Sequence, residues 1–309
     1  TQRGALQHKQ IAERMLKNFP QIFAGKTNVD AKSTVVIRCI LSMENALQEM
    51  TKMNPQLNIT HDASYHDMYY MNYDDTLLFK KRMPTSAMVP YTEFCKNHEH
   101  PERVMRLLFN DDDYWKNHLN ADKLYEVLFK QASNVQSTEL RKSMSLYDLF
   151  TDDEIYDLWQ INNAWWYINY GACPLNGGKQ PYSQRNLLRK IISDADSCIA
   201  LPHPGATLRY GHDTMVMPLT CLMDLDGMGM QVSDLEQLAY KGWNNYRIFP
   251  MACNIQLVFY HKKGSKDILV KVLRNENEAT LPIKTDIAPY YHWKDVRQYY
   301  LDKLNKFTE

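Results

Sequence analysis

A histidine and an aspartate stand side by side in the segment LRYGHDT, where His212 and Asp213 follow a short run typical of a strand. An imidazole can donate hydrogen bonds to an anion, and a carboxyl group can pass a proton to a leaving oxygen. The residues from Thr214 onwards are typical of a helix, and backbone N–H groups at a helix N-terminus favour a negative charge. The segment therefore predicts an anion-binding site with a proton donor beside it.

An arginine occupies an equivalent position earlier in the chain. In STVVIRCILSMENAL, residues 35–37 predict a buried strand that ends at Arg38, and a helical pattern follows. Ligands of open α/β sheets bind at the carboxyl ends of the strands. If the two strands are parallel neighbours, Arg38, His212 and Asp213 meet at one edge, where the guanidinium fork matches phosphate oxygens. This pattern indicates phosphoryl chemistry without a metal ion; the alternative is an ion-paired arginine and a His-Asp turn that only caps a helix.

Other motifs suggest different chemistry. THD at 60–62 and YHD at 65–67 add His-Asp pairs, but a metal-dependent phosphohydrolase would carry its ligands on helices, and these pairs follow strand or loop patterns. CLMDLDGMG resembles the nucleophile motif of haloacid-dehalogenase phosphatases, with Asp224 as nucleophile and Asp226 as acid/base, although Met228 replaces the expected Thr or Val. Its alternative is a helix end with a glycine-containing turn. The spacing of a calcium loop is absent, and we expect no metal ion and no cofactor.

Composition narrows the classes of partner. The chain of 309 residues is 44% hydrophobic and 23% charged, as is usual for a globular protein. Its 36 basic and 36 acidic residues balance, which argues against a general nucleic-acid-binding face but allows a local cationic pocket. The sequence holds no apolar run long enough to span a bilayer. We expect a small phosphorylated substrate and no nucleic acid or membrane partner; no pattern specifies the oligomeric state. The six cysteines form no C-x-x-C pair, and either free thiols or disulfides fit their spacing.

The elements that must position these residues follow the order α/β, all-helical, α/β. Helical spacing over residues 5–19 precedes the strand at 35–37, and QLNITHD at 56–62 alternates like a second strand. ATLRYG, a hairpin over 254–275 and a C-terminal amphipathic helix follow a helical middle region. We therefore predict a Rossmann-like mixed sheet flanked by helices, formed by residues 1–83 and 181–309, with an all-helical insertion domain at residues 84–180.

Three segments together resemble the histidine acid phosphatase family, in the branch that includes phytases. LRYGHDT resembles its second signature, STVVIRCILSMENAL its Ser-Thr-x-x-x-Arg segment, and TQRGALQHKQIAERM its Leu-Thr-x-x-Gly segment, in the family's order and over nearly all of the chain. The resemblance implies metal-independent hydrolysis of phosphomonoesters through a phosphohistidine intermediate, in the periplasm or outside the cell. It implies that Arg38 and His212 bind phosphate and that Asp213 protonates the leaving oxygen; Arg209 is a weaker candidate. Asp213, in place of Ala-Glu, favours acid phosphatases and phytases over the inositol-polyphosphate branch.

The chain departs from the family at the nucleophile, which lies in an Arg-His-Gly-x-Arg motif near the N-terminus. None of the ten histidines follows an arginine and precedes a glycine. In the family this motif precedes the segment that opens the present sequence, so we expect it upstream of Thr1, with the first strand of the sheet, in a protein that was processed or truncated. The chain alone is then expected to be inactive. The alternative is a pseudo-phosphatase, a binding module that keeps the anion pocket, although Asp213 has no evident use in a pure binder.

Overall fold

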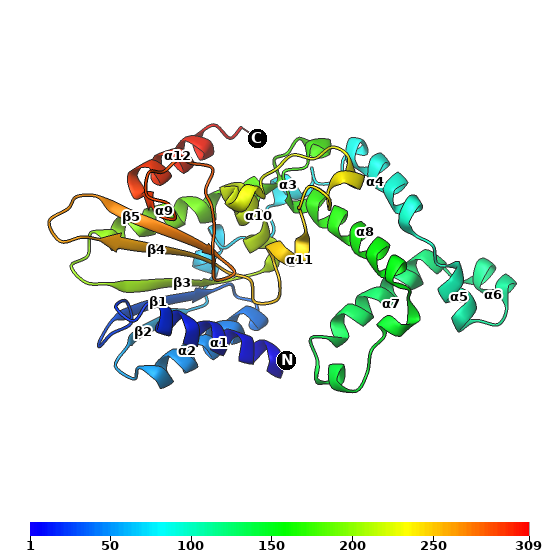
Figure 1. The fold of residues 1–309 in the computed structure, drawn as a ribbon, viewed down its shortest axis with the longest axis horizontal. Helices are drawn as coiled ribbons and strands as arrows, with labels where there is room; N and C mark the ends of the chain where they lie inside the picture. The colour runs from blue at the N-terminus through cyan, green and yellow to red at the C-terminus, as the bar shows by residue number, and fades with distance from the viewer. Residues whose placement is uncertain (309) are drawn as a thin grey trace.

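A three-stranded parallel sheet forms one part of the fold (Figure 1). The computed structural model describes residues 1–308, and its central strand β1 (Asn28–Ser33) pairs with β2 (Asn58–Asp62) on one side and β3 (Gly205–Tyr210) on the other. Two helices, α1 (Gln2–Asn18) and α2 (Ile37–Met53), pack on this sheet. The core between them includes Leu16, Val29, Ala31, Met43 and Leu47.

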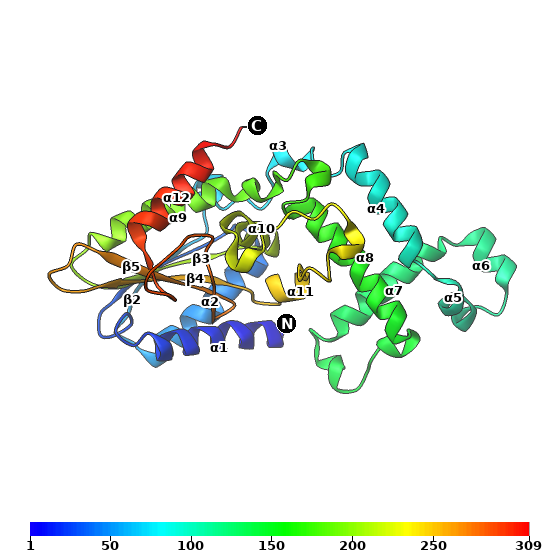
Figure 2. The same cartoon turned by 45° about the horizontal axis from the view of Figure 1, so that its top comes forward.

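A four-stranded antiparallel sheet forms the second part. The predicted hairpin is β4 (Ile255–His261) and β5 (Ile268–Arg274), and the short strands β6 (Asn277–Glu278) and β7 (Tyr291–His292) also pair with β5. The helices α9 (Arg185–Ile199), α10 (Asp213–Met223) and α12 (Trp293–Asn305) share a core with it (Figure 2). The α/β class is confirmed; among residues 1–308, hydrogen bonds divide the strands between two sheets.

The strand predicted at residues 35–37 is wrong. The strand is β1, Asn28–Ser33, and Val36 is already the N-cap of α2, so Arg38 lies in the first turn of that helix. Four of the six residues of NVDAKS are polar, so the segment lacks the apolar run that predicts a buried strand. Val29, Ala31 and Ser33 alternate inward, and both edges of the strand are paired, so its backbone hydrogen bonds are satisfied without such a run. The apolar Ile37 is 73% exposed, because the run belongs to a turn and a helix start.

Between β2 and β3 the regular structure is helical. The elements are η1 (Tyr65–Tyr69), α3 (Thr76–Phe79), α4 (Thr85–His98), α5 (Glu102–Leu108), α6 (Asp112–His118), α7 (Ala121–Val135), η2 (Glu139–Lys142), η3 (Tyr147–Leu149), α8 (Asp152–Tyr170), η4 (Pro174–Asn176) and η5 (Gln180–Gln184). The division at 84–180 stays a prediction. After α10 come η6 (Leu225–Gly227), η7 (Leu235–Gln237) and α11 (Asn245–Ile248).

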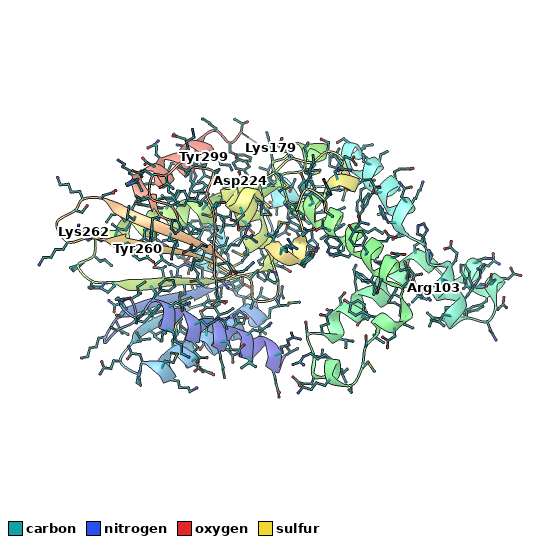
Figure 3. All side chains as sticks on the ribbon, viewed as in Figure 1. Arg103, Lys179, Asp224, Tyr260, Lys262 and Tyr299 are labelled. Atoms are coloured by element: carbon teal, nitrogen blue, oxygen red, sulfur yellow. The ribbon has the colours of Figure 1, made fainter. Side chains whose placement is uncertain are left out.

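The helical region extends away from the sheets. Figure 3 shows Arg103 far out on this region, where it pairs with Glu154, and Lys262 at the opposite end of the molecule, in the loop after β4. No helix within residues 1–308 has the length and apolarity needed to cross a membrane. All six cysteines are free thiols.

Candidate active site

The carboxyl ends of β1 and β3 create the candidate site. The two strands are parallel neighbours, as predicted, and Ser33 pairs with Tyr210 at their ends. The backbone N–H of Thr34 continues the ladder by donating to the carbonyl of Tyr210 at 3.0 Å. The chain then turns into α2 after one strand and into α10 after the other. This geometry brings the first turn of α2, with Arg38, beside His212, the N-cap of α10.

His212 is buried and held on both ring nitrogens. Arg38 Nη2 lies 3.0 Å from Nδ1, and Thr34 Oγ1 lies 3.1 Å from Nε2. A guanidinium can only donate hydrogen bonds, so Nδ1 is the acceptor and the neutral ring carries its proton on Nε2. The ring of Tyr73 packs against it, with centroids 4.5 Å apart. Burial and then the Arg38 charge lower the pKa of His212, whereas Asp213 opposes them.

Cys39 joins the two turns beneath the histidine. Its thiol donates to the carbonyl of Gly211 at 3.1 Å and lies 3.7 Å from His212 Nε2. Burial raises the pKa of Cys39, which keeps the sulfur protonated and argues against a Cys-His nucleophile pair. The sequence patterns did not single this residue out.

Steric crowding explains why position 211, in LRYGHDT, is a glycine. A Cβ on Gly211 would lie 2.7 Å from Met215 Sδ, and Met215 is itself buried in the core of the antiparallel sheet. A larger residue would therefore push against the first turn of α10, which carries Asp213. The glycine therefore leaves room for the buried Met215 side chain.

A cavity of about 250 Å³ opens over these residues. The sheet edge contributes Arg38, His212, Asp213 and Thr214, so all three predicted site residues share one pocket. Asp213 is exposed, and its Oδ1 accepts the Thr214 N–H at 2.8 Å. The remaining lining residues were not predicted: Tyr73, Asp74, Phe79, Arg82 and Tyr170. They come from the helical stretch between β2 and β3, and no sequence spacing links them to a strand end.

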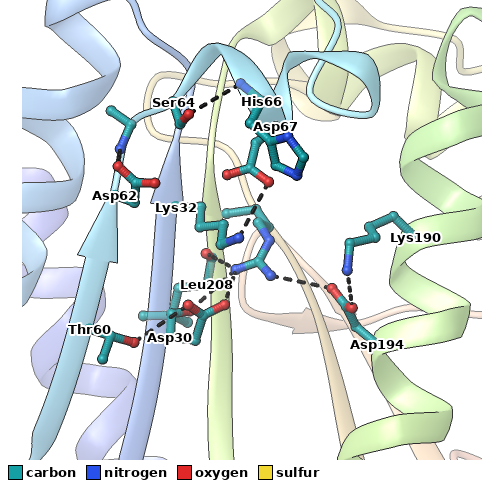
Figure 4. A network of polar contacts seen from close by, with 12 residues as sticks. Asp30, Lys32, Thr60, Asp62, Ser64, His66, Asp67, Lys190, Asp194 and Leu208 are labelled. Atoms are coloured by element: carbon teal, nitrogen blue, oxygen red, sulfur yellow. Dashed lines mark hydrogen bonds and ion pairs between the residues drawn. The ribbon is translucent and has the colours of Figure 1, made fainter.

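The weaker candidate Arg209 has structural partners. Its guanidinium pairs with Asp30 at 2.9 Å and with Asp194 at 3.3 Å, in the network across β1 and β3 that Figure 4 shows. Lys32 lies 3.3 Å from Asp67 in the same network. These pairs tie the parallel sheet to α9 and η1, and none of their residues lines the cavity of the candidate site.

The additional His-Asp pairs also have local partners. His61 Nδ1 lies 2.7 Å from a Glu44 oxygen, and Asp62 accepts the N–H of Ala63. The His66 N–H donates to Ser64 (Figure 4). Within residues 1–308, no group of three or more His, Cys, Asp or Glu side chains is arranged to hold a metal ion.

The two aspartates of CLMDLDGMG stabilise turns. Asp224 is the left-handed C-cap of α10, and its Oδ1 accepts the N–H of Gly229 at 2.7 Å. Asp226 pairs with Arg274 at 2.7 Å and accepts the N–H of Thr280. Both lie at the far end of α10 from His212. The alternative that uses these residues as nucleophile and acid therefore lacks a shared pocket with Arg38.

Comparisons with known proteins agree on one fold. No known family profile matches the chain. "Multiple inositol polyphosphate phosphatase 1" of Gallus gallus is 22% identical over 98% of this chain and 68% of its own length. Among solved structures, the multiple inositol polyphosphate phosphatase of Bifidobacterium longum in complex with phosphate has a TM-score of 0.70 at 17% identity, covering 96% of this chain and 78% of that one. The phytase of D. castellii has a TM-score of 0.63 at 12% identity, covering 98% and 64%.

These likenesses include both a phytase and inositol polyphosphate phosphatases, so the branch favoured by Asp213 stays a prediction. The structures establish the fold. The match to the curated phosphatase spans the same ordered segments that carry the sequence resemblance. The chain is therefore similar to this phosphatase over almost its whole length, and it shares a fold with the inositol polyphosphate phosphatase and phytase structures.

Proposed function

We propose that this protein hydrolyses phosphomonoesters, with Arg38 and His212 binding the phosphoryl group and Asp213 protonating the leaving oxygen. The observation that carries the proposal is the contact between Arg38 and His212 at 3.0 Å in a pocket that Asp213 also lines. Arg38 has no carboxylate partner among residues 1–308, so its charge is available for an anion. The relatives whose names describe phosphatases and a phytase support this class of reaction.

The reaction we propose has two steps. A histidine nitrogen attacks phosphorus, the ester P–O bond breaks, and the carboxyl proton of Asp213 passes to the leaving oxygen. Water then attacks the phosphohistidine, giving a proton to the Asp213 carboxylate as the P–N bond breaks. A phosphate dianion beside His212 favours its protonated form, so the ring can change from accepting an Arg38 hydrogen bond to donating one to the phosphate.

We propose that the nucleophile lies outside the 309 residues, on a further strand. None of the ten histidines stands in an Arg-His-Gly motif. Among residues 1–308, β3 pairs only with β1, which leaves its second edge unpaired. A parallel strand on that edge would end beside His212, and this position supports the proposal.

The test uses the protein with all residues encoded before Thr1. We expect hydrolysis of p-nitrophenyl phosphate in the presence of a chelator, and an acid-labile phosphoenzyme after a rapid quench with labelled substrate. Arg38→Gln should lower kcat/KM by about 10²–10³-fold, as is typical when a charge-stabilising donor is lost. Arg106→Gln is the matched control, because Arg106 pairs with Asp112 on the helical region.

Two outcomes would contradict the proposal. Equal activity in the Arg38 and Arg106 variants would remove Arg38 from the phosphate site. A longer protein that binds inorganic phosphate but neither hydrolyses the ester nor forms the phosphoenzyme would favour the binding-module alternative.

A further inference from the structure

The two ring nitrogens of His212 lie in different surroundings. Its Nδ1 faces Arg38, which lines the cavity of the candidate site. Its Nε2 lies 3.1 Å from Thr34 Oγ1, and Thr34 is fully buried and does not line that cavity. One nitrogen can therefore meet a ligand, whereas the other is enclosed by the protein.

Thr34 belongs to a chain of hydrogen bonds that runs in one direction. The Nε2–H of the neutral ring donates to Thr34 Oγ1. Burial raises the pKa of Cys39, and a hydrogen bond from the Thr34 hydroxyl to its sulfur lowers it in part. The thiol of Cys39 donates in turn to the carbonyl of Gly211 at 3.1 Å, one residue before the histidine. Because each group donates to the next, the Thr34 oxygen keeps its lone pairs for Nε2–H.

The position of Thr34 is set by its backbone. Its N–H donates to the Tyr210 carbonyl at 3.0 Å, which continues the pairing of β1 with β3. Its own carbonyl accepts a hydrogen bond from Ser33 Oγ at 2.9 Å. Threonine is branched at Cβ, which restricts its χ1 rotamers. The hydroxyl is therefore held in one place beside the ring before any ligand arrives.

We propose that Thr34 is a positioning residue, whose hydroxyl holds Nε2–H of His212 so that Nδ1 takes up a proton when an anion binds. The inference rests on the proposed function of the pocket. In the neutral ring, Nδ1 accepts from Arg38 and Nε2–H donates to Thr34. In the protonated ring, Nε2–H still donates to Thr34, and the new Nδ1–H donates to a phosphate oxygen. Only the Arg38 side changes its hydrogen bond, so the charged state requires little reorganisation.

The groups around the ring make this acceptor more important for the charged state. Burial and the Arg38 charge lower the pKa of His212, and Asp213 opposes them. Cys39 and Tyr73 also contact the ring, but the raised pKa of Cys39 keeps its sulfur neutral. An imidazolium donates a stronger hydrogen bond than a neutral imidazole. Removing the hydroxyl acceptor should therefore lower the pKa of His212 further.

The test measures phosphate binding at two pH values. The protein with all residues encoded before Thr1 is titrated calorimetrically with inorganic phosphate at pH 5 and pH 8, at fixed ionic strength. Thr34→Val keeps the shape but removes the acceptor. It should weaken binding about tenfold at pH 5, where the ring is charged in the complex, and less than about threefold at pH 8, where it is neutral. Thr34→Ser keeps the hydroxyl and should change binding less than about threefold at both.

Thr220→Val is the matched control, because Thr220 is also buried but donates to the Val216 carbonyl of its own helix. Imidazole ¹⁵N spectra of histidine-labelled protein give a second readout, with the His212 signals assigned by their loss in His212→Gln. The free protein should carry its proton on Nε2, and phosphate at pH 5 should add a proton on Nδ1. Thr34→Val should require a lower pH for this second proton, a change that a general loss of stability does not produce.

The outcomes separate the two proposals. If the unmodified protein does not bind phosphate, or Arg38→Gln leaves phosphate binding unchanged, the proposed function fails. If Thr34→Val matches the Thr220 control, loses the same factor at both pH values, or equals Thr34→Ser, the role of Thr34 fails alone. Should Thr34→Val not fold, the spectra of the unmodified protein decide: a proton on Nε2 that is retained when phosphate binds supports the role, and a neutral ring with its proton on Nδ1 overturns it.

Discussion

His212 connects the chemistry of the site to its local structure. Arg38 and Thr34 fix its tautomer, and Cys39 holds the carbonyl that precedes it. Burial lowers the pKa of His212, so the ring is neutral while it accepts the Arg38 hydrogen bond. An arriving phosphate would compete for that hydrogen bond and raise the proton affinity of the ring. The neutral histidine, already held in one orientation, is therefore suited to bind an arriving anion.

Asp213 is the residue whose proposed role is easiest to isolate. In the longer protein, we expect Asp213→Asn to slow hydrolysis of alkyl phosphates by about 10²–10⁴-fold, since a poor leaving group needs a proton in the transition state. Activated aryl phosphates need no such proton and should slow much less. Measuring kcat/KM over a series of leaving groups gives the dependence on leaving-group pKa, which should steepen in the variant. An equal loss across the series would argue against Asp213 as the acid.

The residues of the sheet edge were predictable, and those of the helical side were not. Arg38 and His212 were found because each follows a strand and precedes a helix, and this rule survived the misplaced strand: with β1 at Asn28–Ser33, Arg38 still emerges at the same edge. Arg82 and Tyr73 reach the pocket only through the packing of distant helices, which no local spacing encodes.

At the scale of elements, the side chain of His98 connects α4 to α8 and η7. Its Nδ1 lies 2.8 Å from Asp157 on α8, and its Nε2 lies 3.0 Å from Glu236 in η7, so both ring nitrogens face carboxylates. Burial lowers the pKa of His98, but the hydrogen bonds to the two carboxylates outweigh it and leave the pKa raised. A doubly protonated ring can donate to both, which makes the contact between α4, α8 and η7 dependent on pH.

We expect His98→Gln to destabilise the protein more at pH 5.5 than at pH 9. Because the folded-state pKa is raised, the stabilisation is fully present below the unfolded pKa near 6.5 and is lost as pH rises through the folded value. The difference between the two losses should be about 1–2 kcal/mol, since Glu236 is partly exposed and its contribution is screened. Urea unfolding of both proteins at each pH measures it. Equal losses at both pH values would contradict a pH-dependent contact between His98 and the two carboxylates.

The sequence predicted those elements whose own residues show a clear alternating or helical hydrophobic pattern. The β4–β5 hairpin alternates clearly around a Lys-Gly-Ser turn, and α12 has a regular amphipathic spacing, so both were confirmed. The strand β1 was missed because its stability comes from neighbours on both edges, a property that its own six residues do not display.

At the scale of the whole molecule, α8 passes through two separate cores. Leu158, in its first half, belongs to a cluster formed with α5, α6 and α7, which includes Trp115 and Tyr125. Ile161 and Tyr167, in its second half, belong to a cluster with α4, α10 and the segment around Trp243. The helix therefore couples an outer helical unit to the helix that carries Asp213 at its N-terminus.

Two cores on one helix predict that the outer unit opens by itself. Tyr125 is 1% exposed, and Tyr125→Ala should cost the outer cluster about 3–5 kcal/mol through the cavity it leaves. Because this cluster shares no residue with those around β1 and β5, we expect faster amide hydrogen exchange over residues 102–158 and unchanged exchange in the sheets. Hydrogen-exchange mass spectrometry measures both regions in one experiment. Faster exchange throughout the chain would show that α8 transmits the loss and that the molecule unfolds as one cooperative unit, in which case the pocket would depend on the outer helices for its stability.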